Sequence, residues 1–299
     1  MRRFRRAAAA LCSCGRCCGP ALLLLTAGCA TVPFQQTGAL SSYVGLAPSN
    51  GILTRAQIGV SRNDLLAATA VRIVPTSYSA AALAAGLSDT QRHMVGNAID
   101  RSMCIGLSDR FRIVAPDAPA DLTVHAVITH VGLTDETMAG ASRVVSVGAS
   151  VAEKIFVPYP VPVPTPRIPL GLGGLAVEAE ARDPGGRQKA AMVWARGADI
   201  VTSKPKVSTA GDAYDLAKAF ADDFSKLVVT AASPFNTMPS LPSINRINAM
   251  IGGRPREAAC EVFGRGPGVV GMISDGIGLP PEWTDHGAAV MAPTARDMR

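Results

Sequence analysis

The stretch Leu175-Ala-Val-Glu-Ala-Glu-Ala-Arg-Asp-Pro-Gly-Gly-Arg187 decides the fold of this chain, because its local chemistry predicts a β-hairpin. Apolar and polar side chains alternate up to Arg182, and a period of two places them on opposite faces of a strand. The Asp-Pro-Gly-Gly sequence supplies a turn, after which Gln188 to Ile200 forms the second strand. We expect a core face and a solvated face, made respectively by Leu175, Val177, Ala179 and Ala181 and by Glu178, Glu180 and Arg182.

Three more strands are predicted upstream of this hairpin. The β-branched run Thr69 to Val74 is stopped by Pro75, and Arg110 to Val114 is closed by Pro116. Asp121 to His130 alternates again, with one face made by Leu122, Val124, Ala126 and Ile128.

Two main helices are predicted beside these strands. Ser88-Asp-Thr-Gln91 is a capping box, and the buried face of the helix that follows should hold Gln91, Val95, Ala98, Ile99, Ser102, Met103 and Gly106. Its opposite, polar face carries His93, Asn97, Asp100, Cys104 and Ser108. Asp212 to Val228 has an apolar stripe, with acidic residues in its first turn and Lys226 in its last, so it should close the core.

This order of elements predicts an α+β fold, an antiparallel or mixed sheet of about five strands with the two main helices on one face. The folded domain is expected over residues 59–232, with a Pro-rich insertion at 138–172. Alternate prolines from Pro158 to Pro166 favour extended polyproline II, either as a stiff spacer or as a segment that a partner binds. Residues 233–299 form a Gly- and Pro-rich tail.

Residues 1–28 have the parts of a lipoprotein signal peptide. Four arginines precede an apolar run, and Leu22-Leu-Leu-Leu-Thr-Ala-Gly-Cys29 ends it like a lipobox. We expect Cys29 to be acylated and to hold the chain on a membrane through its acyl chains. The alternative is that an ordinary peptidase cuts nearby and Cys29 stays a plain thiol. Ala30, in place of the Asp that retains lipoproteins in the inner membrane, favours the periplasmic leaflet of the outer membrane.

The charge of the chain argues against nucleic acid as a partner. The formal net charge is +6 from 29 basic and 23 acidic residues, but five arginines lie in the leader, which leaves 24 against 23. A nucleic-acid-binding protein needs a basic stripe on the folded domain. With 48% hydrophobic and only 5% aromatic residues, the core should consist mainly of Ala, Val, Leu and Ile.

Residues 29–58 are predicted to be the lipidated anchor and a linker, because Ala30 to Gln57 is poor in charge and rich in Pro, Gly, Ser and Gln. Within it, Thr37-Gly-Ala-Leu-Ser-Ser-Tyr-Val-Gly-Leu-Ala-Pro48 resembles the signature of the bacterial lipoprotein family catalogued as domain of unknown function 3313. The matching positions are Gly38, Leu40, Tyr43, Leu46 and Pro48. The resemblance runs from the lipobox to about residue 231. It implies a location in the cell envelope and no particular activity.

Two cysteines are candidates for a disulfide. Once the leader is removed and Cys29 is acylated, Cys104 and Cys260 are the remaining thiols, and an oxidising periplasm preserves structural disulfides. Their pairing would lay the region around Cys260 across the polar face of the first main helix. The alternative is two unrelated, half-buried thiols.

The sequence predicts no catalytic, metal or cofactor site. His125 and His130 differ by an odd number along one strand and should point to opposite faces, whereas His93 and His286 are isolated. Glu178 and Glu180 share a face, as a paired-carboxylate mechanism requires, but a solvated sheet face is the simpler interpretation. Gly266-Pro-Gly-Val-Val-Gly271 has the letters of a dinucleotide fingerprint without an evident preceding strand or following helix.

Three functions are compatible with these observations. The first is a non-catalytic interaction or structural module of the cell envelope, which should co-purify with a protein partner. The second is a protein that binds an apolar ligand or lipid, with Met138 to Val157 as lid or groove wall and an apolar cavity facing the membrane. The third is an envelope hydrolase, which needs a cleft where titratable side chains converge.

Overall fold

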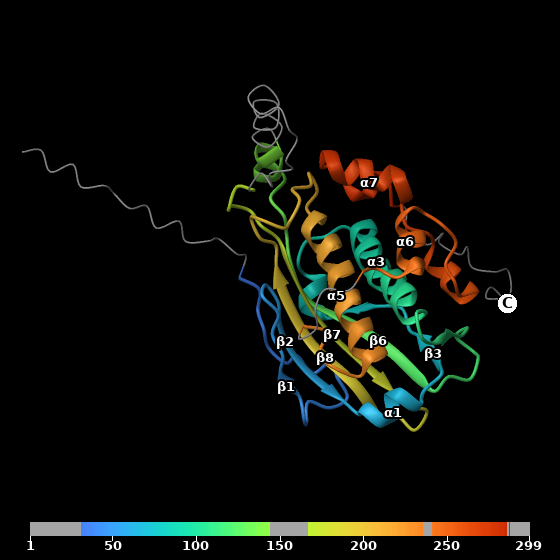
Figure 1. The fold of residues 1–299 in the computed structure, drawn as a ribbon. Helices are drawn as coiled ribbons and strands as arrows, with labels where there is room; N and C mark the ends of the chain where they lie inside the picture. The colour runs from blue at the N-terminus through green and yellow to red at the C-terminus, as the bar shows by residue number, and fades with distance from the viewer. Residues whose placement is uncertain (1–30, 144–166, 236–240, 286, 288–299) are drawn as a thin grey trace, which may run out of the picture.

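A computed structural model describes residues 31–143, 167–235, 241–285 and 287 of this chain (Figure 1). Its centre is a mixed sheet in the order β1-β2-β8-β7-β6-β3-β5, with β4 pairing β6 off this path. The strands are β1 Ala47–Pro48, β2 Arg55–Val60, β3 Ala70–Ile73, β4 Ser77–Tyr78, β5 Arg112–Ile113, β6 Leu122–Gly132, β7 Gly174–Arg182 and β8 Gln188–Gly197.

The helices lie between and after these strands. They are α1 Arg62–Ala67, α2 Ala80–Leu83, α3 Asp89–Leu107, α5 Gly211–Thr230, α6 Ile244–Met250 and α7 Gly268–Ile277, with 3-10 turns η1 Ala258–Phe263 and η2 Pro281–Trp283. Residues 136–143 are also helical. None of the helices in the described parts of the chain is long and apolar enough to cross a membrane.

The predicted α+β class is confirmed, and the hairpin is its centre. β7 and β8 pair antiparallel, with Glu178 opposite Val193 and Val177 opposite Trp194. The sheet has eight strands instead of about five. The additional ones are the short β1 and β4, and β2, which lies between β1 and β8. Ala56, Ile58 and Val60 do alternate along β2, but this strand overlaps the segment expected to be a linker.

Helices α3 and α5 cover one face of the sheet, as the sequence predicts (Figure 1). The stripe of α5 is buried, and Phe220 meets the ring of Trp194 edge-on at a centroid distance of 5.6 Å. The Trp194 Nε1 also donates to Asp223 Oδ2 at 3.0 Å, so both the apolar ring and the polar nitrogen of this buried side chain are satisfied.

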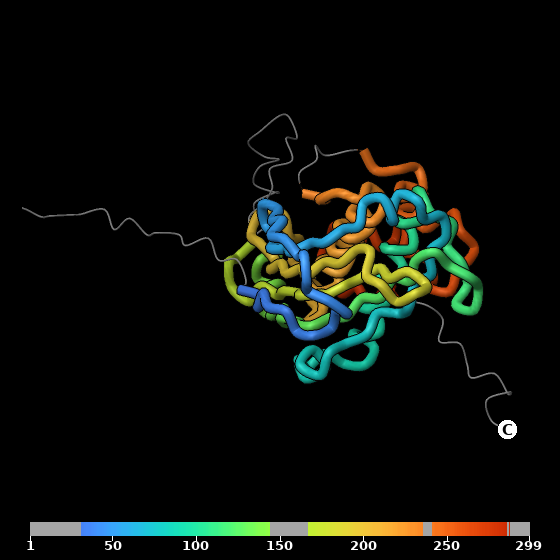
Figure 2. Tube along the Cα trace, turned by 90° about the horizontal axis from the view of Figure 1, so that it is seen from below, coloured from blue at the N-terminus to red at the C-terminus, as the bar shows by residue number. Residues whose placement is uncertain are grey.

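The other face of the sheet is covered by residues 32–46, here called the N-terminal strap. The expectation of a free spacer in this region is wrong for these residues. Val32 packs against Ala176 and Ala195, and Leu40 packs against Ala191 and Val193. In Figure 2 the first described residues, in dark blue, and α5, in orange, lie on opposite sides of the hairpin strands. The hairpin is therefore buried on both faces.

The strap corrects the prediction that Glu178 and Glu180 lie on a solvated face, since both are buried. Glu178 Oε1 accepts from the backbone N–H of Thr37 at 2.7 Å, and its Oε2 accepts from Ala39 N at 3.1 Å and from the Tyr43 hydroxyl. Glu180 Oε2 accepts from Ser41 N at 2.9 Å and from Ser41 Oγ at 2.5 Å. These donors compensate for the loss of water around the two carboxylates.

A bulge in β6 corrects the expected orientation of two histidines. The register between β6 and β7 shifts between Ile128 and His130, so that His125 lies opposite Glu180 and His130 lies opposite Ala176. One extra residue in a strand reverses the alternation beyond it. Both histidines consequently point to the face of the sheet that carries the strap.

The polar face predicted for α3 is also covered. The capping box at Ser88 is present, but Asn97, Asp100 and Cys104 on the expected outer face are buried. The chain after residue 241 covers Asn97 and Cys104, and the loop at Thr76 covers Asp100. A helix that is buried on nearly all sides need not have one apolar face and one polar, solvent-exposed face. For this reason the expectation that the polar face of α3 is exposed is wrong.

Most of the Pro-rich insertion, including Pro158 to Pro166, lies outside the described residues. Its end is described, and Arg167 there is buried, with its Nη1 2.5 Å from Asp212 Oδ1 at the start of α5. Asp212 also accepts from Gly173 N at 2.8 Å and from Thr134 Oγ1 at 2.9 Å. One buried carboxylate thus joins the start of α5 to the loop after β6 and the loop before β7.

The buried carboxylates predict a specific loss of stability. Glu178→Gln keeps the shape but replaces one acceptor oxygen with an NH2 group that faces backbone or hydroxyl donors. We expect a loss of about 2 kcal/mol in the free energy of unfolding, measured by urea titration. The matched control is Glu261→Gln, which removes only the exposed pair with Arg265 and should change stability by less than about 0.5 kcal/mol. Equal effects of the two substitutions would contradict the role assigned to Glu178.

Candidate functional site

Residues 241–285, here called the tail cover, lie across the outer sides of α3 and α5. Cys260 in η1 forms a disulfide with Cys104 on α3, with the Cα atoms 5.8 Å apart. Asn97 Nδ2 donates to the Phe263 carbonyl at 2.9 Å, and Phe263 itself is buried. The tail cover, whose Gly- and Pro-rich sequence shows no clear helix or strand pattern, is thus an ordered layer on α3 and α5.

Buried ion pairs hold the far end of the tail cover. The Arg101 guanidinium on α3 contacts both carboxylate oxygens of Asp285, which also accepts from the Tyr214 hydroxyl. Burial alone would raise the pKa of Asp285, but the hydrogen bond and charge of Arg101 outweigh it and lower that pKa. Asp285 therefore stays ionised, and its pair joins α3, α5 and the tail cover.

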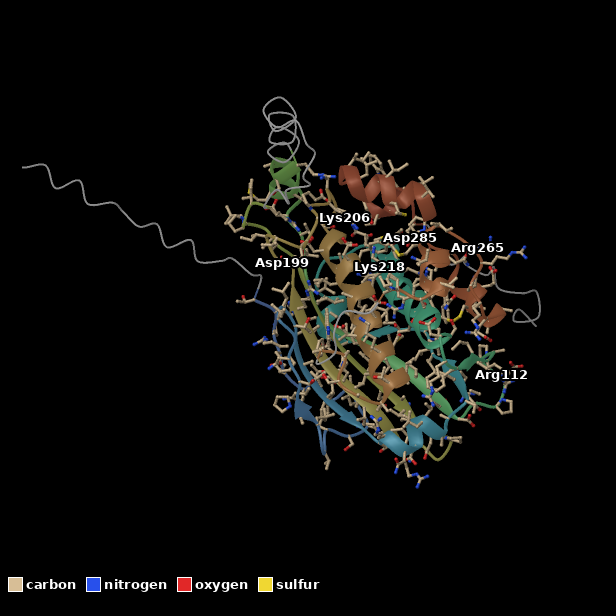
Figure 3. All side chains as sticks on the ribbon, in the orientation of Figure 1. Arg112, Asp199, Lys206, Lys218, Arg265 and Asp285 are labelled. Carbon is tan, nitrogen blue, oxygen red and sulfur yellow. A yellow bond between two sulfur atoms is a disulfide. The ribbon has the colours of Figure 1, made fainter. Side chains whose placement is uncertain are left out.

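A second cluster of charges surrounds Lys206, which is fully buried. Its Nζ lies 2.6 Å from Asp215 Oδ1 and 3.0 Å from Asp275 Oδ1, and Lys218 Nζ lies 2.8 Å from Asp215 Oδ1. Both lysines also face the ring of Tyr214. Burial would raise the pKa of Asp215, but the charges of Lys218 and Lys206 lower it to about 2. Figure 3 shows Lys206, Lys218 and Asp285 gathered between α5 and the tail.

A cavity of about 340 Å³ lies beside these pairs, between α3, α5, α6 and α7. Its wall combines apolar side chains, Ile105, Met250 and Met272, with charged ones. Each charged side chain of the wall has an opposite partner, in the pairs Arg101–Asp285, Lys218–Asp215, Arg246–Asp222 and Asp275–Lys206. The volume suits a small ligand, whereas the paired charges provide no strong attraction for an anion or a cation.

A second cavity, of about 540 Å³, lies on the other side of α3 and includes Tyr78, His93, Asp100 and Phe263 in its wall. Burial raises the pKa of Asp100 to about 7, even though the hydrogen bonds from Thr76 N and Thr76 Oγ1 act to lower it. Burial likewise raises the pKa of Tyr78. Asp100 can hold or release a proton near neutral pH, but its carboxylate is directed at the loop that it fastens.

The structure does not assemble the remaining sequence motifs into a site. Cys29 and His286 lie outside the described residues. In the described ranges, no group of three or more His, Cys, Asp or Glu side chains could hold a metal ion. The expectation that no helix follows Gly266-Pro-Gly-Val-Val-Gly271 is wrong, because α7 begins at Gly268. No strand in the described chain leads into it, so the context of a dinucleotide site is still missing.

Comparison with known families identifies the chain. The family described as "Protein of unknown function (DUF3313)" matches residues 35–224. The chain belongs to this family. The resemblance inferred from Gly38, Leu40 and Tyr43 is confirmed, and the structure explains it, since Leu40 and Tyr43 of the DUF3313 signature hold the strap on the buried hairpin. The match ends before the tail cover, which is therefore an addition to the DUF3313 region of this chain.

Other comparisons give only distant similarity. None of the curated proteins matches the sequence of this DUF3313 protein. Among solved structures, two of the PelC dodecamer from Paraburkholderia phytofirmans are similar to it, one of them of a single-residue variant. The variant shares 8% identity at a TM-score of 0.33, covering 60% of this chain and 99% of its own. The other shares 9% identity at a TM-score of 0.32, covering 62% and 99%.

The disulfide predicts how the tail cover responds to reduction. Alkylation of the denatured mature chain with acylated Cys29 should modify no thiol before reduction and two after it. Reduction should also speed trypsin cleavage at Arg256 and Arg265, because the disulfide closes a loop of 156 residues and contributes up to about 5 kcal/mol. Cleavage at Arg187 in the exposed hairpin turn is the internal control. Two reactive thiols before reduction would show that the pair is not formed.

Asp100 predicts a dependence of stability on pH. Its pKa in the folded protein, about 7, lies above the ordinary 3.8, so the folded state binds this proton more tightly than the unfolded state. The contribution of Asp100 is complete below about pH 4 and is lost as the pH rises to about 7. Asp100→Asn should remove this loss, and its stability relative to wild type should rise by about 4 kcal/mol across that range, at about 1.36 kcal/mol for each unit of pKa difference.

Urea unfolding at several pH values measures this difference. Asp117→Asn, at an exposed aspartate, is the matched control and should follow the wild-type pH dependence. Parallel curves for wild type and Asp100→Asn would refute the assignment.

Proposed function

We propose that this protein is a lipid-anchored, non-catalytic interaction module of the cell envelope, held by Cys29 on the periplasmic leaflet of the outer membrane. The observation that carries the proposal is the outer surface of the tail cover, where large apolar side chains are exposed over an interior whose buried charges pair with one another. On and beside α6 these are Leu241, Ile244, Ile247, Met250 and Ile251, each 49% to 94% exposed. Exposed apolar patches on folded domains mark interaction sites.

The family signature supports a structural use of its residues. Tyr43 and the backbone of the strap bind Glu178 and Glu180, which are the paired carboxylates that a hydrolase would otherwise offer. The other buried charges of the tail region are paired with one another. A hydrolase needs titratable groups that are free to reach a substrate, and in the described residues the clusters around Lys206 and Asp285 are engaged in holding the tail cover.

A second candidate is a protein that binds an apolar ligand or lipid. The cavity beside Ile105, Met250 and Met272 favours it, because its volume of about 340 Å³ fits a small molecule and these side chains are apolar. The stretch Met138 to Val157, expected as lid or groove wall, lies largely outside the described residues.

Cross-linking in native membranes tests the proposal. The wild-type protein should incorporate labelled fatty acid, fractionate with the outer membrane and cross-link to a defined protein complex. Cys29→Ser should lose the label completely. Ile244→Asp with Ile247→Asp should keep the label and lose most of the cross-linked complex, because two charges cannot be buried in an apolar contact. The matched control is Val44→Asp with Leu66→Asp, at exposed apolar positions far from α6.

Each negative result has a separate meaning. Label on the Cys29→Ser protein would refute the anchor. A complex that survives in the α6 variant, or is lost equally in the control, would refute the interaction surface. Co-purification of a small apolar molecule in place of a protein would favour the second candidate.

A further inference from the structure

Helix α7 has its large apolar side chains on the outside. Its buried positions are Gly268, Gly271 and Ser274, a seam of small residues three apart. Its outer side carries Val269, Val270, Met272, Ile273 and Ile277, each 51% to 66% exposed. Its only charged residue, Asp275, turns to the interior and pairs with Lys206. A surface helix of a soluble domain normally has the reverse arrangement, so this face needs an apolar partner outside the domain.

Helix α7 is fixed at the end of the sheet where the loops after β6 and β8 lie. The Gly278 carbonyl that follows it accepts from Val207 N at 3.1 Å, and Arg143 donates to the Gly276 carbonyl. More apolar side chains are exposed on the loops of this end, namely Leu133, Leu170, Val201 and Val207. Figure 1 shows α7 at the top of the molecule and α1 at the bottom.

The described chain starts at the same end of the sheet. Val32 lies against Gly174, the first residue of β7, and its carbonyl accepts from Arg55 Nη2 at 2.5 Å. Val32 is the third residue after Cys29, and three fully extended residues span about 10 Å. An acylated Cys29 would therefore hold this end of the sheet within about 10 Å of the membrane surface.

We propose that the outer face of α7, formed by Val269, Val270, Met272, Ile273 and Ile277, inserts into the surface of the lipid leaflet that holds the anchor. The inference rests on the proposed anchoring at Cys29, and it names the partner of a second surface, separate from α6. Amphipathic helices bind membranes in this way, with the apolar side in the boundary between headgroups and acyl chains. The short tether and the α7 face together fix the orientation of the domain on the membrane.

The size of the face favours lipid over a second copy of the chain. A helix of ten residues is about 15 Å long and about 10 Å wide. The area of this face, roughly its length times its width, is far below the roughly 800 Å² that each partner buries in a stable protein interface. A lipid surface needs no matching shape, so a face of this size can insert into it.

Vesicle binding tests this inference without the acyl chains. The mature chain with Cys29→Ser, exported behind an ordinary cleavable leader so that the disulfide forms, is floated with vesicles of phosphatidylethanolamine and phosphatidylglycerol. We expect a measurable bound fraction. Val270→Asp with Ile273→Asp should lower the partition coefficient at least about tenfold, because two half-buried apolar side chains are lost from the lipid. Val44→Asp with Leu66→Asp, at exposed positions away from α7, should bind as the parent does.

A second pair, Val269→Ser with Ile277→Ser, removes apolar area without charge and should also weaken binding, so that the test does not depend on one variant folding. A parent chain that stays unbound, equal losses in the α7 and control variants, or an α7 variant that alters only the oligomeric state would each overturn the inference. Because Cys29 is absent from these proteins, none of these outcomes depends on acylation. Failure of fatty-acid labelling in cells is thus a distinct result that refutes only the proposed anchor.

Discussion

The burial of two carboxylates at the centre of the hairpin is the constraint on which the rest of the structure depends. Glu178 and Glu180 alternate with small apolar residues of β7, so any cover on that face has to bring hydrogen-bond donors with it. The strap does so with three backbone N–H groups, one tyrosine and one serine hydroxyl. An apolar cover would leave the charges without partners, and water would have to remain. The strap therefore has a fixed register on β7.

The tail cover follows the same principle on the opposite side of the molecule. Helix α3 presents Asn97, Arg101 and Cys104 outward. Each has a specific partner in residues 260–285, respectively the Phe263 carbonyl, the Asp285 carboxylate and the disulfide-bonded sulfur of Cys260. Polar partners of this kind give the tail one position on the helices, whereas its few buried apolar residues, such as Phe263, give adhesion. A segment rich in Gly and Pro can be ordered in this way without long secondary structure of its own.

How much of this could be predicted from the sequence depends on the range of the interactions. The hairpin, β6 and α5 follow from local alternation or a helical stripe and agree with the structure. Burial of Glu178 could not be inferred, because its partners are about 140 residues away in the sequence. The bulge at Thr129, which turns His130, leaves no local signal. The family signature is the one indication in the sequence that the strap is ordered, because a large aromatic residue such as Tyr43 is unusual in a flexible spacer.

The sequence suggests the Cys104–Cys260 disulfide only because these are the two remaining thiols in an oxidising compartment. The structure contains this disulfide because the tail covers the outer side of α3, which the helical pattern of α3 does not indicate. It also imposes an order on assembly. A chain that emerges from its N-terminus delivers β2 to α5 first, and during that time the outer side of α3 has no cover. Cys104, beside Asn97 and Arg101, therefore remains a free and potentially reactive thiol until 156 further residues have emerged. Maturation of this protein thus includes an interval in which Cys104 is reactive, and this interval ends when Cys260 pairs with it.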